Sequence, residues 1–522
     1  MLSCVLSCGI NGIDSYIVRA ETDISEGMPM FELVGYLGSE VREARERVRT
    51  ALKNAGHQMP VKRVTVNLSP ANIRKQGTGF DLPVAVSILT AMQELTQESV
   101  ADTVFAGELL LSGKVSGIRG ILPIVLAAKG AGCRRCIVPK DNAAEGAVVD
   151  GIEIVGVEGL SQLTEYLKGV CEIESERFSG KTLLASQSGS GCDLKDVQGQ
   201  HFVKRGLEIT AAGLHNAIML GPPGAGKTML AKCIPTILPP LSLEECLEVS
   251  AIYSVAGRLG KGHNLITKRP FISPHHTVTD KALAGGGAVP HPGSISLAHR
   301  GVLFLDEMPE FSKNALEILR QPMEDKVIHV ARNYGSVTYP ADFMLIGAMN
   351  PCPCGSYPDL DKCTCTESMR KLYQNKISKP LLDRMDVCME VSKLKYGELV
   401  KSKEEETSAA VRKRVIKAQQ IQMERFQTDN EKGSFGSDKN DSPDPKKKIL
   451  FNSQMGIREI EKYCKLTQAG KKLMKEAFTK FDLSARAYHR ILRTARTIAD
   501  LDNAVQINEY HLAEAIHFRF HN

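Results

Sequence analysis

Hydrophobic and polar positions follow different patterns in three successive parts of the chain. In residues 1–170, short runs of β-type residues alternate with stretches of helical periodicity, which is typical of an α/β or α+β domain. The pattern predicts helices at Glu40–Ala55 and Pro83–Glu94. It predicts strands at Ser15–Val18, Val64–Leu68, Thr103–Ala106, Cys136–Val138 and Ile152–Val157.

The apolar runs in residues 193–395 are uninterrupted instead of alternating. They lie at Ala217–Leu220, Val302–Leu305 and Phe343–Ala348. Strands of this composition occur in the middle of a parallel sheet, where helices cover both faces. We therefore expect a second α/β domain, built on a central parallel sheet. A linker at 171–192, which contains the Ser- and Gly-rich stretch 179–190, would join it to the first domain.

From residue 396 to residue 522 the periodicity is helical. Between the first two predicted helices, residues 428–448 are rich in Asp, Ser, Pro, Gly and Lys, and we expect a mobile loop there. The predicted helices are Thr407–Phe426, Gly456–Thr479, Ala485–Asp500 and Ile507–Phe518.

The composition argues against several classes of protein. Hydrophobic residues make up 43% of the chain and charged residues 24%, as in globular proteins, and 522 residues allow roughly three or four domains. No apolar run approaches the ~18 residues of a membrane-spanning helix, so we expect no membrane partner. The first eight residues lack the basic segment of a secretion signal. Many of the 14 cysteines are scattered singly, which favours a reducing, cytoplasmic location.

Basic residues are concentrated near the C-terminus. The formal net charge of the whole chain is +6. From Lys446 to the end, 15 Lys and Arg stand against 8 Asp and Glu, so this segment carries +7 and the remainder −1. Such a segment favours an anionic partner such as a nucleotide or nucleic acid, although a solvated helix face would have the same composition.

One segment has the residues of a phosphate-binding loop. It matches the pattern G-x-x-x-x-G-K-[ST], follows an apolar run and precedes a helical pattern. In such a loop, backbone N–H groups converge on phosphate oxygens, the lysine adds a positive charge and the hydroxyl ligates Mg²⁺. The sequence therefore predicts that a nucleoside triphosphate is bound by Gly221, Pro222, Pro223, Gly224, Ala225, Gly226, Lys227 and Thr228.

Two further apolar runs end in polar side chains. Asp306 and Glu307 follow one run, and Asn350 follows the other. Because ligands bind at the carboxyl ends of parallel strands, we expect these side chains to lie close to the phosphate loop. Asp306 would then support Mg²⁺, and Glu307 would orient or deprotonate the attacking water. Asn350 would hold that water or contact the γ-phosphate.

Two arginines are candidates to stabilise the transition state. Arg384 follows the predicted sheet, and Arg486 stands at the head of a predicted helix. Charge on the γ-phosphate calls for an arginine, often supplied by a neighbouring subunit, and a site completed in this way implies a ring. On sequence grounds alone, surface salt bridges would explain both arginines equally well.

Together these segments resemble the YifB/ComM family of magnesium-chelatase-like AAA+ ATPases. The resemblance covers nearly the whole chain, through the motifs Asn67–Ala71, Gly79–Pro83, Gly107–Leu109, Arg119–Pro123, Asp196–Gln200, Pro274–Thr277, Gly285–Gly287, Pro292–His299, Asn350–Gly355 and Ala495–Leu501.

The resemblance implies an AAA+ core at 193–395, a helical lid at 396–522 and a homo-hexameric ring that hydrolyses ATP with Mg²⁺. In that ring Arg384 would be a finger that acts in trans, and Arg486 would be the lid arginine that senses the nucleotide.

A long Gly-, Pro- and His-rich stretch, Ile272–Arg300, separates the phosphate loop from Asp306. The resemblance implies that such an insertion forms a pore-facing loop. His275, His276 and Lys281 would then touch a polymer threaded through the ring, although adjacent histidines commonly hydrogen-bond locally instead.

Four cysteines follow Asn350 in two C-x-C pairs, Cys352 with Cys354 and Cys363 with Cys365. Four thiolates could bind Zn²⁺ tetrahedrally and fix the loop. The usual spacing of zinc ligands is wider, so a redox pair or free thiols remain open as alternatives.

The N-terminal domain resembles the Lon-protease (S5-like) fold. Lon proteases use a Ser–Lys dyad, in which the lysine activates the serine. Alignment on that pattern puts Leu122 at the lysine position, and the serine region, Lys75–Asp81, contains no serine. We therefore expect a docking or oligomerisation domain without peptidase activity.

The resemblance to ComM-like members implies a helicase that drives DNA branch migration during recombination and natural transformation. The basic C-terminal segment, the insertion and the ring suit a DNA backbone. Aromatic residues total only 5% and Trp is absent, so an aromatic-rich binding face is missing. The alternative is a chelatase-type remodeller of a protein partner. An ATP-dependent protease is disfavoured by the missing dyad.

Overall fold

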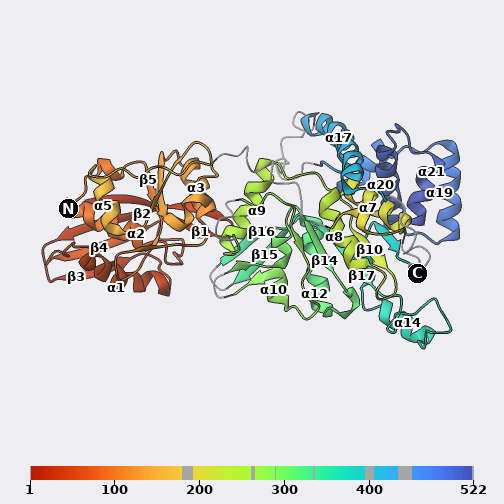
Figure 1. Cartoon of the computed structure of the whole chain (residues 1–522), viewed down its shortest axis with the longest axis horizontal. Coiled ribbons are helices and arrows are strands. Elements are labelled where there is room, and N and C mark those ends of the chain that lie inside the picture. Colours follow the sequence, from red (N-terminus) through yellow and green to blue (C-terminus); the bar gives the residue numbers. More distant parts are fainter. Residues whose placement is uncertain are drawn as a thin grey trace.

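The computed structural model describes residues 2–178, 192–259, 265–287, 290–332, 335–393, 405–432 and 449–519. Three parts lie in a row: an N-terminal α/β domain, a central α/β domain and a C-terminal group of helices (Figure 1). They correspond to the three patterns in the sequence. The predicted linker stretch 179–190 and most of the predicted loop 428–448 lie outside the described residues.

The N-terminal domain is built on a seven-stranded mixed sheet, in the order β3-β4-β2-β1-β5-β8-β9. β1 and β2 pair antiparallel through a two-residue loop that begins with Gly12, whose φ of +71° is readily adopted by glycine. The strands are β1 (Leu2–Asn11), β2 (Asp14–Ser25), β3 (Met30–Val34), β4 (Arg63–Ser69), β5 (Thr103–Phe105), β8 (Arg135–Pro139) and β9 (Glu153–Val157).

Helices cover both faces of this sheet. One face packs on α1 (Ser39–Asn54), α2 (Asp81–Ala91) and α5 (Leu160–Leu167), and the other on α3 (Ile121–Gly130) and α4 (Lys140–Gly146). α2 is buried along its whole length because it lies between α1 and the sheet. The sequence pattern located the predicted elements of this domain to within a few residues at most ends. It missed the strands β1 and β3 and the helices α3, α4 and α5.

The positions related to the Lon-type dyad hold packed side chains. Leu122 is fully buried in the first turn of α3. Lys75 is also buried, and its ammonium donates hydrogen bonds to the carbonyl oxygens of Ile73, at 2.9 Å, and Pro70. Burial lowers the pKa of Lys75. The lack of peptidase activity stays a prediction.

The central domain contains a five-stranded parallel sheet in the order β11-β14-β17-β10-β18. The predicted parallel sheet is thus confirmed. Its three inner strands are the predicted apolar runs, and the sequence missed the two edge strands. The strands are β10 (Ala217–Leu220), β11 (Phe271–Ile272), β14 (Val302–Leu305), β17 (Met344–Met349) and β18 (Val387–Glu390).

Alternate residues of these strands face two different cores. One core includes α7 (His201–Gly213), α8 (Lys227–Ile237) and the C-terminal helices. The other includes α12 (Lys313–Ile318) and the hairpin of β15 (Val327–Arg332) with β16 (Gly335–Pro340). The stretch 272–300 forms short elements beside the second core, namely α10 (Asp280–Ala284), β12 (Gly285–Gly286), β13 (His291–Pro292) and α11 (Ser294–Leu297).

The C-terminal part is helical, as predicted, with two differences in the bounds. The predicted helix at 456–479 is two helices, because Thr467 caps the second one by accepting a hydrogen bond from the Gly470 N–H. The predicted helix at 407–426 continues to Lys432, into the predicted loop. The helices are α17 (Ser408–Lys432), α18 (Ile457–Tyr463), α19 (Gln468–Lys480), α20 (Ala485–Leu501) and α21 (Glu509–His517). None of the helices in the described ranges is both long and apolar enough to cross a membrane.

The N-terminal domain meets the central domain where α3 packs against α9 (Leu243–Val255). The Gly120 N–H donates a hydrogen bond to the Ser254 carbonyl at 3.3 Å, and the Ser254 hydroxyl bonds to Glu145. Ala251 of α9 joins the apolar core around α3. The contact therefore combines apolar packing with hydrogen bonds.

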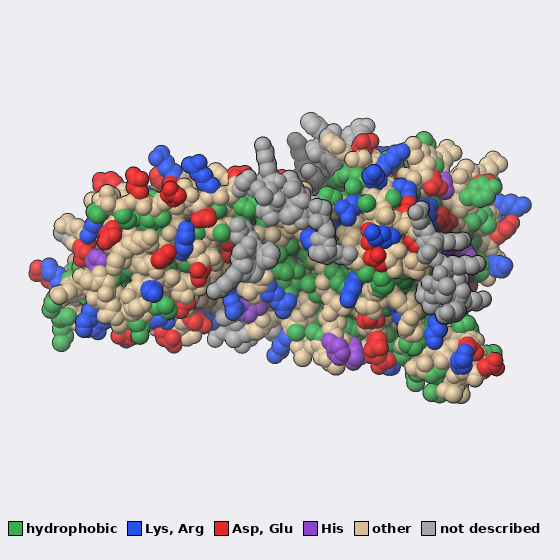
Figure 2. Space-filling view, in the orientation of Figure 1, with side chains coloured by type: hydrophobic (Ala, Val, Ile, Leu, Met, Phe, Trp, Pro, Cys, Tyr) green, Lys and Arg blue, Asp and Glu red, His purple; other side chains and the backbone are tan. Residues whose placement is uncertain are grey.

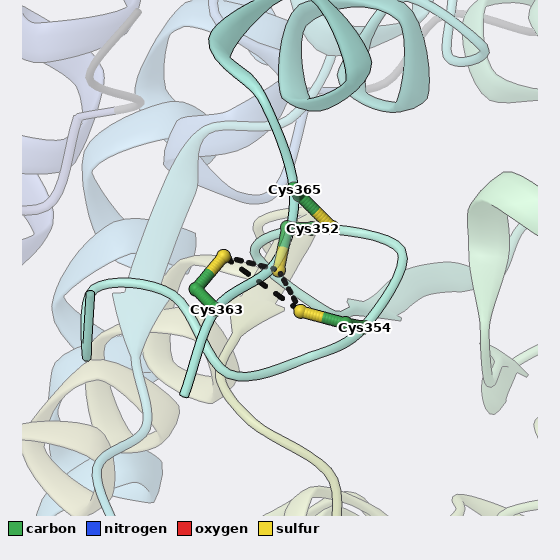
Figure 3. A group of neighbouring side chains, drawn as sticks. All are labelled: Cys352, Cys354, Cys363 and Cys365. Atoms are coloured by element: carbon green, nitrogen blue, oxygen red, sulfur yellow. Dashed lines mark hydrogen bonds between the residues drawn. The ribbon is translucent and has the colours of Figure 1, made fainter. Parts of the chain in front are cut away.

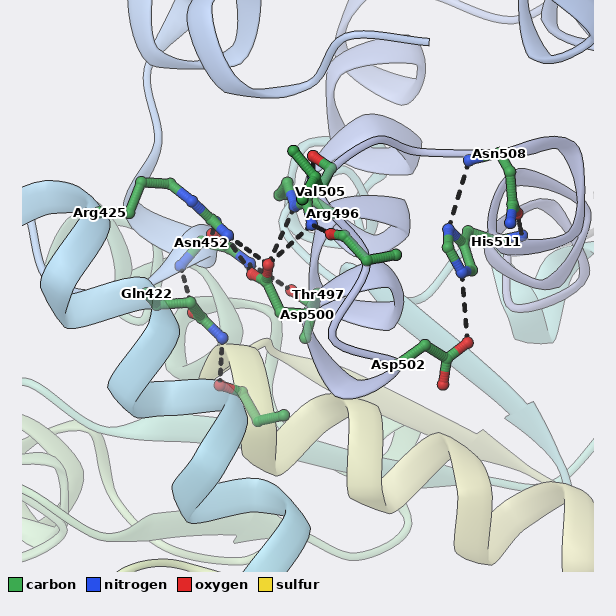
Figure 4. Close-up of polar contacts among 12 residues, drawn as sticks. Gln422, Arg425, Asn452, Arg496, Thr497, Asp500, Asp502, Val505, Asn508 and His511 are labelled. Atoms are coloured by element: carbon green, nitrogen blue, oxygen red, sulfur yellow. Dashed lines mark hydrogen bonds and ion pairs between the residues drawn. The ribbon is translucent and has the colours of Figure 1, made fainter. Parts of the chain in front are cut away.

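A buried polar network holds the C-terminal helices together (Figure 4). Asp500 of α20 is only 2% exposed and pairs with Arg425 of α17 and Arg496 of α20. Asn452 donates a further hydrogen bond to Asp500 at 2.8 Å. A buried carboxylate is stable only when it is paired and hydrogen-bonded, so this network fixes α17 against α20.

We expect Asp500→Ala to destabilise the C-terminal helices by about 3–5 kcal/mol, because it leaves two guanidinium groups without their shared carboxylate. Asp502→Ala is a matched control, since the Asp502 side chain is 50% exposed and its loss should cost about 1 kcal/mol or less. Thermal unfolding followed by circular dichroism should show a lower midpoint for Asp500→Ala. Equal midpoints for the two variants would contradict the role of the network.

Candidate functional site

The predicted phosphate loop connects the carboxyl end of β10 to the start of α8. Gly224 and Gly226 have φ values of +75° and +87°, a region that other residues rarely adopt. At Gly221 a Cβ would lie 2.3 Å from the carbonyl oxygen of Val391. These three glycines let the backbone turn tightly at the N-terminus of α8, where anions bind.

Lys227 is the first residue of α8, and its ammonium group is held inside the loop. Nζ donates hydrogen bonds to the carbonyl oxygens of Gly221, at 2.6 Å, and Pro222, at 3.0 Å, and to Oδ1 of Asn350 at 3.0 Å. Burial lowers the pKa of Lys227, while Asp306 and Glu307 oppose that shift. The lysine therefore links the phosphate loop to the end of β17.

Thr228 links the same loop to the end of β14. Its hydroxyl donates a hydrogen bond to Oδ2 of Asp306 at 2.7 Å, and Oδ1 of Asp306 accepts one from the Glu307 N–H at 3.0 Å. Glu307 has a φ of +50°, in the left-handed region, which costs roughly 1–2 kcal/mol for a residue with a Cβ. Strained backbone of this kind is concentrated at functional sites.

The three predicted pieces of the nucleotide site thus converge at one edge of the sheet. They do so because β14, β17 and β10 are adjacent parallel strands that end at the same edge. The donor set fits a nucleotide bound with Mg²⁺: a lysine and a glycine-rich turn for phosphate, and a hydroxyl and a carboxylate as hard oxygen ligands for Mg²⁺.

His276 lies beside this site, which the sequence did not indicate. It comes shortly after β11, the neighbour of β14, and its Nδ1 is 3.6 Å from Oε2 of Glu307. His275 is exposed and its Nδ1 hydrogen-bonds to the Thr277 hydroxyl, and Lys281 is exposed on α10. The rings of His275 and His276 lie with their centroids 4.1 Å apart, so His276 contacts both its neighbour and the acid. The role of His275, His276 and Lys281 in touching a polymer stays a prediction.

Arg384 lies at the amino ends of the parallel strands, opposite the carboxyl ends where the phosphate loop lies. β18 runs parallel to β10 with Val387 opposite Ala217, so Arg384 precedes the strand that the loop follows. Four residues of strand separate the two edges by roughly 13 Å. Nη1 of Arg384 donates to the Pro380 carbonyl at 2.6 Å, and Nη2 pairs with Glu324.

Arg486 is at this same edge. Its Nη1 lies 3.9 Å from Oδ2 of Asp383, and its side chain is 72% exposed. Arg490, one turn later on α20, donates to the carbonyl oxygens of Leu382 and Met385, both at 2.8 Å. The head of α20 is therefore docked next to Arg384, away from the phosphate loop of its own chain.

The four predicted cysteines are also brought together. The sulfur atoms of Cys352, Cys354, Cys363 and Cys365 all lie within 4.8 Å of one another (Figure 3). They belong to the loop between β17 and α14 (Glu367–Gln374), directly after Asn350.

Three family models match the chain and together cover most of it. The model described as magnesium chelatase, subunit ChlI, matches residues 193–399. The model for subunit ChlI of Mg-chelatase matches residues 20–142, and the one for the ChlI C-terminal part matches residues 405–519. The fold and the matches define a magnesium-chelatase-like AAA+ protein.

Two relatives extend over almost the whole chain. The chain is 40% identical over 528 residues to the competence protein ComM of Haemophilus influenzae, covering 99% of this chain and 97% of that protein. It is 40% identical over 513 residues to the YifB protein of Salmonella typhimurium, covering 97% and 95%. The chain therefore belongs to the YifB/ComM family of magnesium-chelatase-like AAA+ ATPases.

A weaker match concerns the Lon-like fold. Lon protease 4 of Sorangium cellulosum is 27% identical over 176 residues, which cover 32% of this chain and 22% of that protein. This match supports a distant likeness to Lon proteases.

We expect Lys227→Ala to lower the affinity for ATP by more than tenfold, because the phosphate loop loses its buried ammonium group. Lys232→Ala, an exposed lysine further along α8, removes the same charge outside the loop and should leave the affinity unchanged. Calorimetric titration of each variant with ATP and Mg²⁺ measures both. Equal affinities in the two variants would refute the assignment of Lys227.

Proposed function

We propose that the protein hydrolyses ATP in a homo-hexameric ring and uses that reaction to move DNA, as a branch-migration helicase in recombination and natural transformation. One observation carries the ring: the phosphate-binding groups lie at one edge of the sheet, and Arg384 with Arg486 lies at the other. Each chain holds both parts of a site without joining them. Head-to-tail contacts around a closed ring would join them between neighbours.

Within such a composite site the side chains have distinct tasks. Lys227 binds the β- and γ-phosphates, and Asn350 holds the attacking water or the γ-phosphate. Glu307 accepts the proton of that water. Thr228 and Asp306 would hold Mg²⁺, which when bound neutralises charge on the phosphates. Arg384 and Arg486 of the neighbouring chain face the γ-phosphate as its charge develops.

Two inactive variants should complement each other when mixed. The Arg384→Ala variant lacks the arginine finger but keeps Glu307. The Glu307→Gln variant lacks the general base but keeps Arg384 and Arg486. Each alone should lose about 10²-fold or more in turnover, as expected for loss of a base or a finger. In a mixed ring, the Arg384→Ala chain supplies Glu307 to a site, and a neighbouring Glu307→Gln chain supplies Arg384 to the same site. That site contains every group, so the turnover should recover in part.

The controls for this experiment are set by the structure. Glu310 is an exposed acid three residues after Glu307, and Glu310 pairs with Lys376. The Glu310→Gln variant should therefore turn over ATP normally. If mixed rings that exchange subunits stay as inactive as the single variants, Arg384 does not act in trans.

DNA as the substrate is supported by the relative's name, competence protein, and by the charge of α19. Lys471, Lys472 and Lys475 are exposed on this helix, opposite its buried residues Met474 and Ala477. Lys and Arg side chains are visible at the end of the molecule where α19 and α21 lie (Figure 2). A basic helix face of this kind attracts a phosphate backbone without reading its sequence.

We expect added branched or single-stranded DNA to raise the rate of ATP turnover, and salt to weaken the effect. Changing Lys471, Lys472 and Lys475 together to Gln should weaken DNA stimulation and reduce its salt dependence, while turnover without DNA stays unchanged.

A triple variant of exposed lysines on the N-terminal domain is the matched control, because it removes the same charge elsewhere: Lys53, Lys62 and Lys129 to Gln. Stimulation should persist in this control. Turnover in well-formed hexamers that does not respond to DNA would instead favour the chelatase-type remodeller of a protein partner.

A further inference from the structure

The loop that follows β17 has almost no apolar core of its own. No residue from Ser356 to Leu372 is buried, Cys363 and Cys365 being half-buried, and Leu360 is 73% exposed. Small units without a sufficient apolar core are usually held by disulfides or metal ions. The loop instead brings together the side chains of its four cysteines, which the nucleotide site does not use.

The distances among these sulfur atoms fit one metal ion better than a disulfide. Sγ of Cys352 and Sγ of Cys363 are 3.7 Å apart, as are those of Cys354 and Cys363, and Cys352 and Cys354 are 3.3 Å apart. A tetrahedral zinc site with Zn–S distances of about 2.3 Å puts its sulfurs about 3.8 Å apart. A disulfide needs about 2.05 Å.

The backbone around the pairs is shaped to bring the sulfurs together. The Gly355 N–H donates to the Cys352 carbonyl at 3.0 Å, and the Cys363 N–H donates to the Asp359 carbonyl at 2.9 Å. These two turns direct three of the thiols at one another (Figure 3). Cys365, in the segment just before α14, is the fourth member of the group.

The same loop touches the nucleotide site at two points. Gly355, with a φ of +77°, lies against the phosphate loop so closely that a Cβ would be 2.5 Å from Cδ of Pro223. Cys352, which belongs to the cysteine group, is only two residues after Asn350. The position of Asn350 therefore depends on the shape of this loop.

We propose that Cys352, Cys354, Cys363 and Cys365 bind one Zn²⁺ as thiolates, and that the metal fixes the loop that holds Asn350 against the phosphate loop. Each thiol that is protonated beforehand releases its proton to solvent on binding. The second part of this proposal rests on the nucleotide binding proposed above, whereas the metal site itself does not.

The first test measures metal content in the full-length chain, purified with a reductant and without chelator. We expect about one zinc per chain by elemental analysis, and close to none in the double variant Cys363→Ser/Cys365→Ser. The double variant Cys4→Ser/Cys171→Ser removes two thiols outside the group and should keep its zinc. Substoichiometric zinc in the natural chain, or equal zinc in both double variants, would overturn the site.

A second readout keeps the metal site testable even if the double variant folds poorly. Zinc in the natural chain should be replaceable by Co²⁺, which in a tetrahedral thiolate site gives intense visible absorption. A Cys352–Cys354 disulfide found in metal-free, folded protein would instead show a redox pair and overturn the proposal.

The link to the nucleotide is tested by titrating ATP before and after zinc is removed and restored. Removal should weaken ATP binding about tenfold, and added zinc should restore it. Unchanged affinity would refute the link while leaving the metal site intact. Failure of the zinc-loaded chain to bind ATP at all would count against the proposed function and not against the zinc site.

Discussion

The geometry of the protein depends on one constraint: parallel strands deliver their carboxyl ends to the same edge of a sheet. β10, β17 and β14 are neighbours, so the phosphate loop arrives within hydrogen-bond distance of Asn350 at the end of one strand and of Asp306 at the end of another. Lys227 and Thr228 then close the group, each by one contact to a different strand end. The tasks proposed for Lys227, Asn350, Thr228 and Asp306 depend on these two contacts.

The same sheet explains why the two candidate arginines lie apart from the phosphate loop of their own chain. The loop before β18 lies at the amino edge, and α20 is anchored to that loop through Arg490. Both candidate arginines are thereby fixed at a distance from the phosphates of their own chain. The buried network around Asp500 holds α20 against α17, which in turn packs on α7 and α8. The C-terminal helices therefore connect the amino ends of the strands, where the arginines lie, to α8 at the carboxyl ends. They do so without bringing the arginines into contact with the phosphate loop.

The sequence predicted those features that depend on short, continuous segments. The inner strands, the phosphate loop and the polar residues at the strand ends are each encoded within a few consecutive positions. Contacts between distant segments could not be predicted in this way. The pairing of Arg486 with Asp383 depends on how α20 packs, and the proximity of His276 to Glu307 depends on which strand lies next to β14. Only knowledge that β11 borders β14 would have pointed to His276. Thr467 is a residue type that commonly caps a helix, but the helical periodicity continues on both sides of it. The pattern therefore predicted one helix where the structure has two.

The contact between α3 and α9 has a further consequence. Only the short segment 238–242 separates α8, which starts at Lys227, from α9, which bears the N-terminal domain. Because this segment is so short, a tilt of α8 when a triphosphate binds or leaves would be transmitted to α9 and would move the N-terminal domain. The N-terminal domain is thus coupled to α8 through α9 and a stretch of only five residues, 238–242.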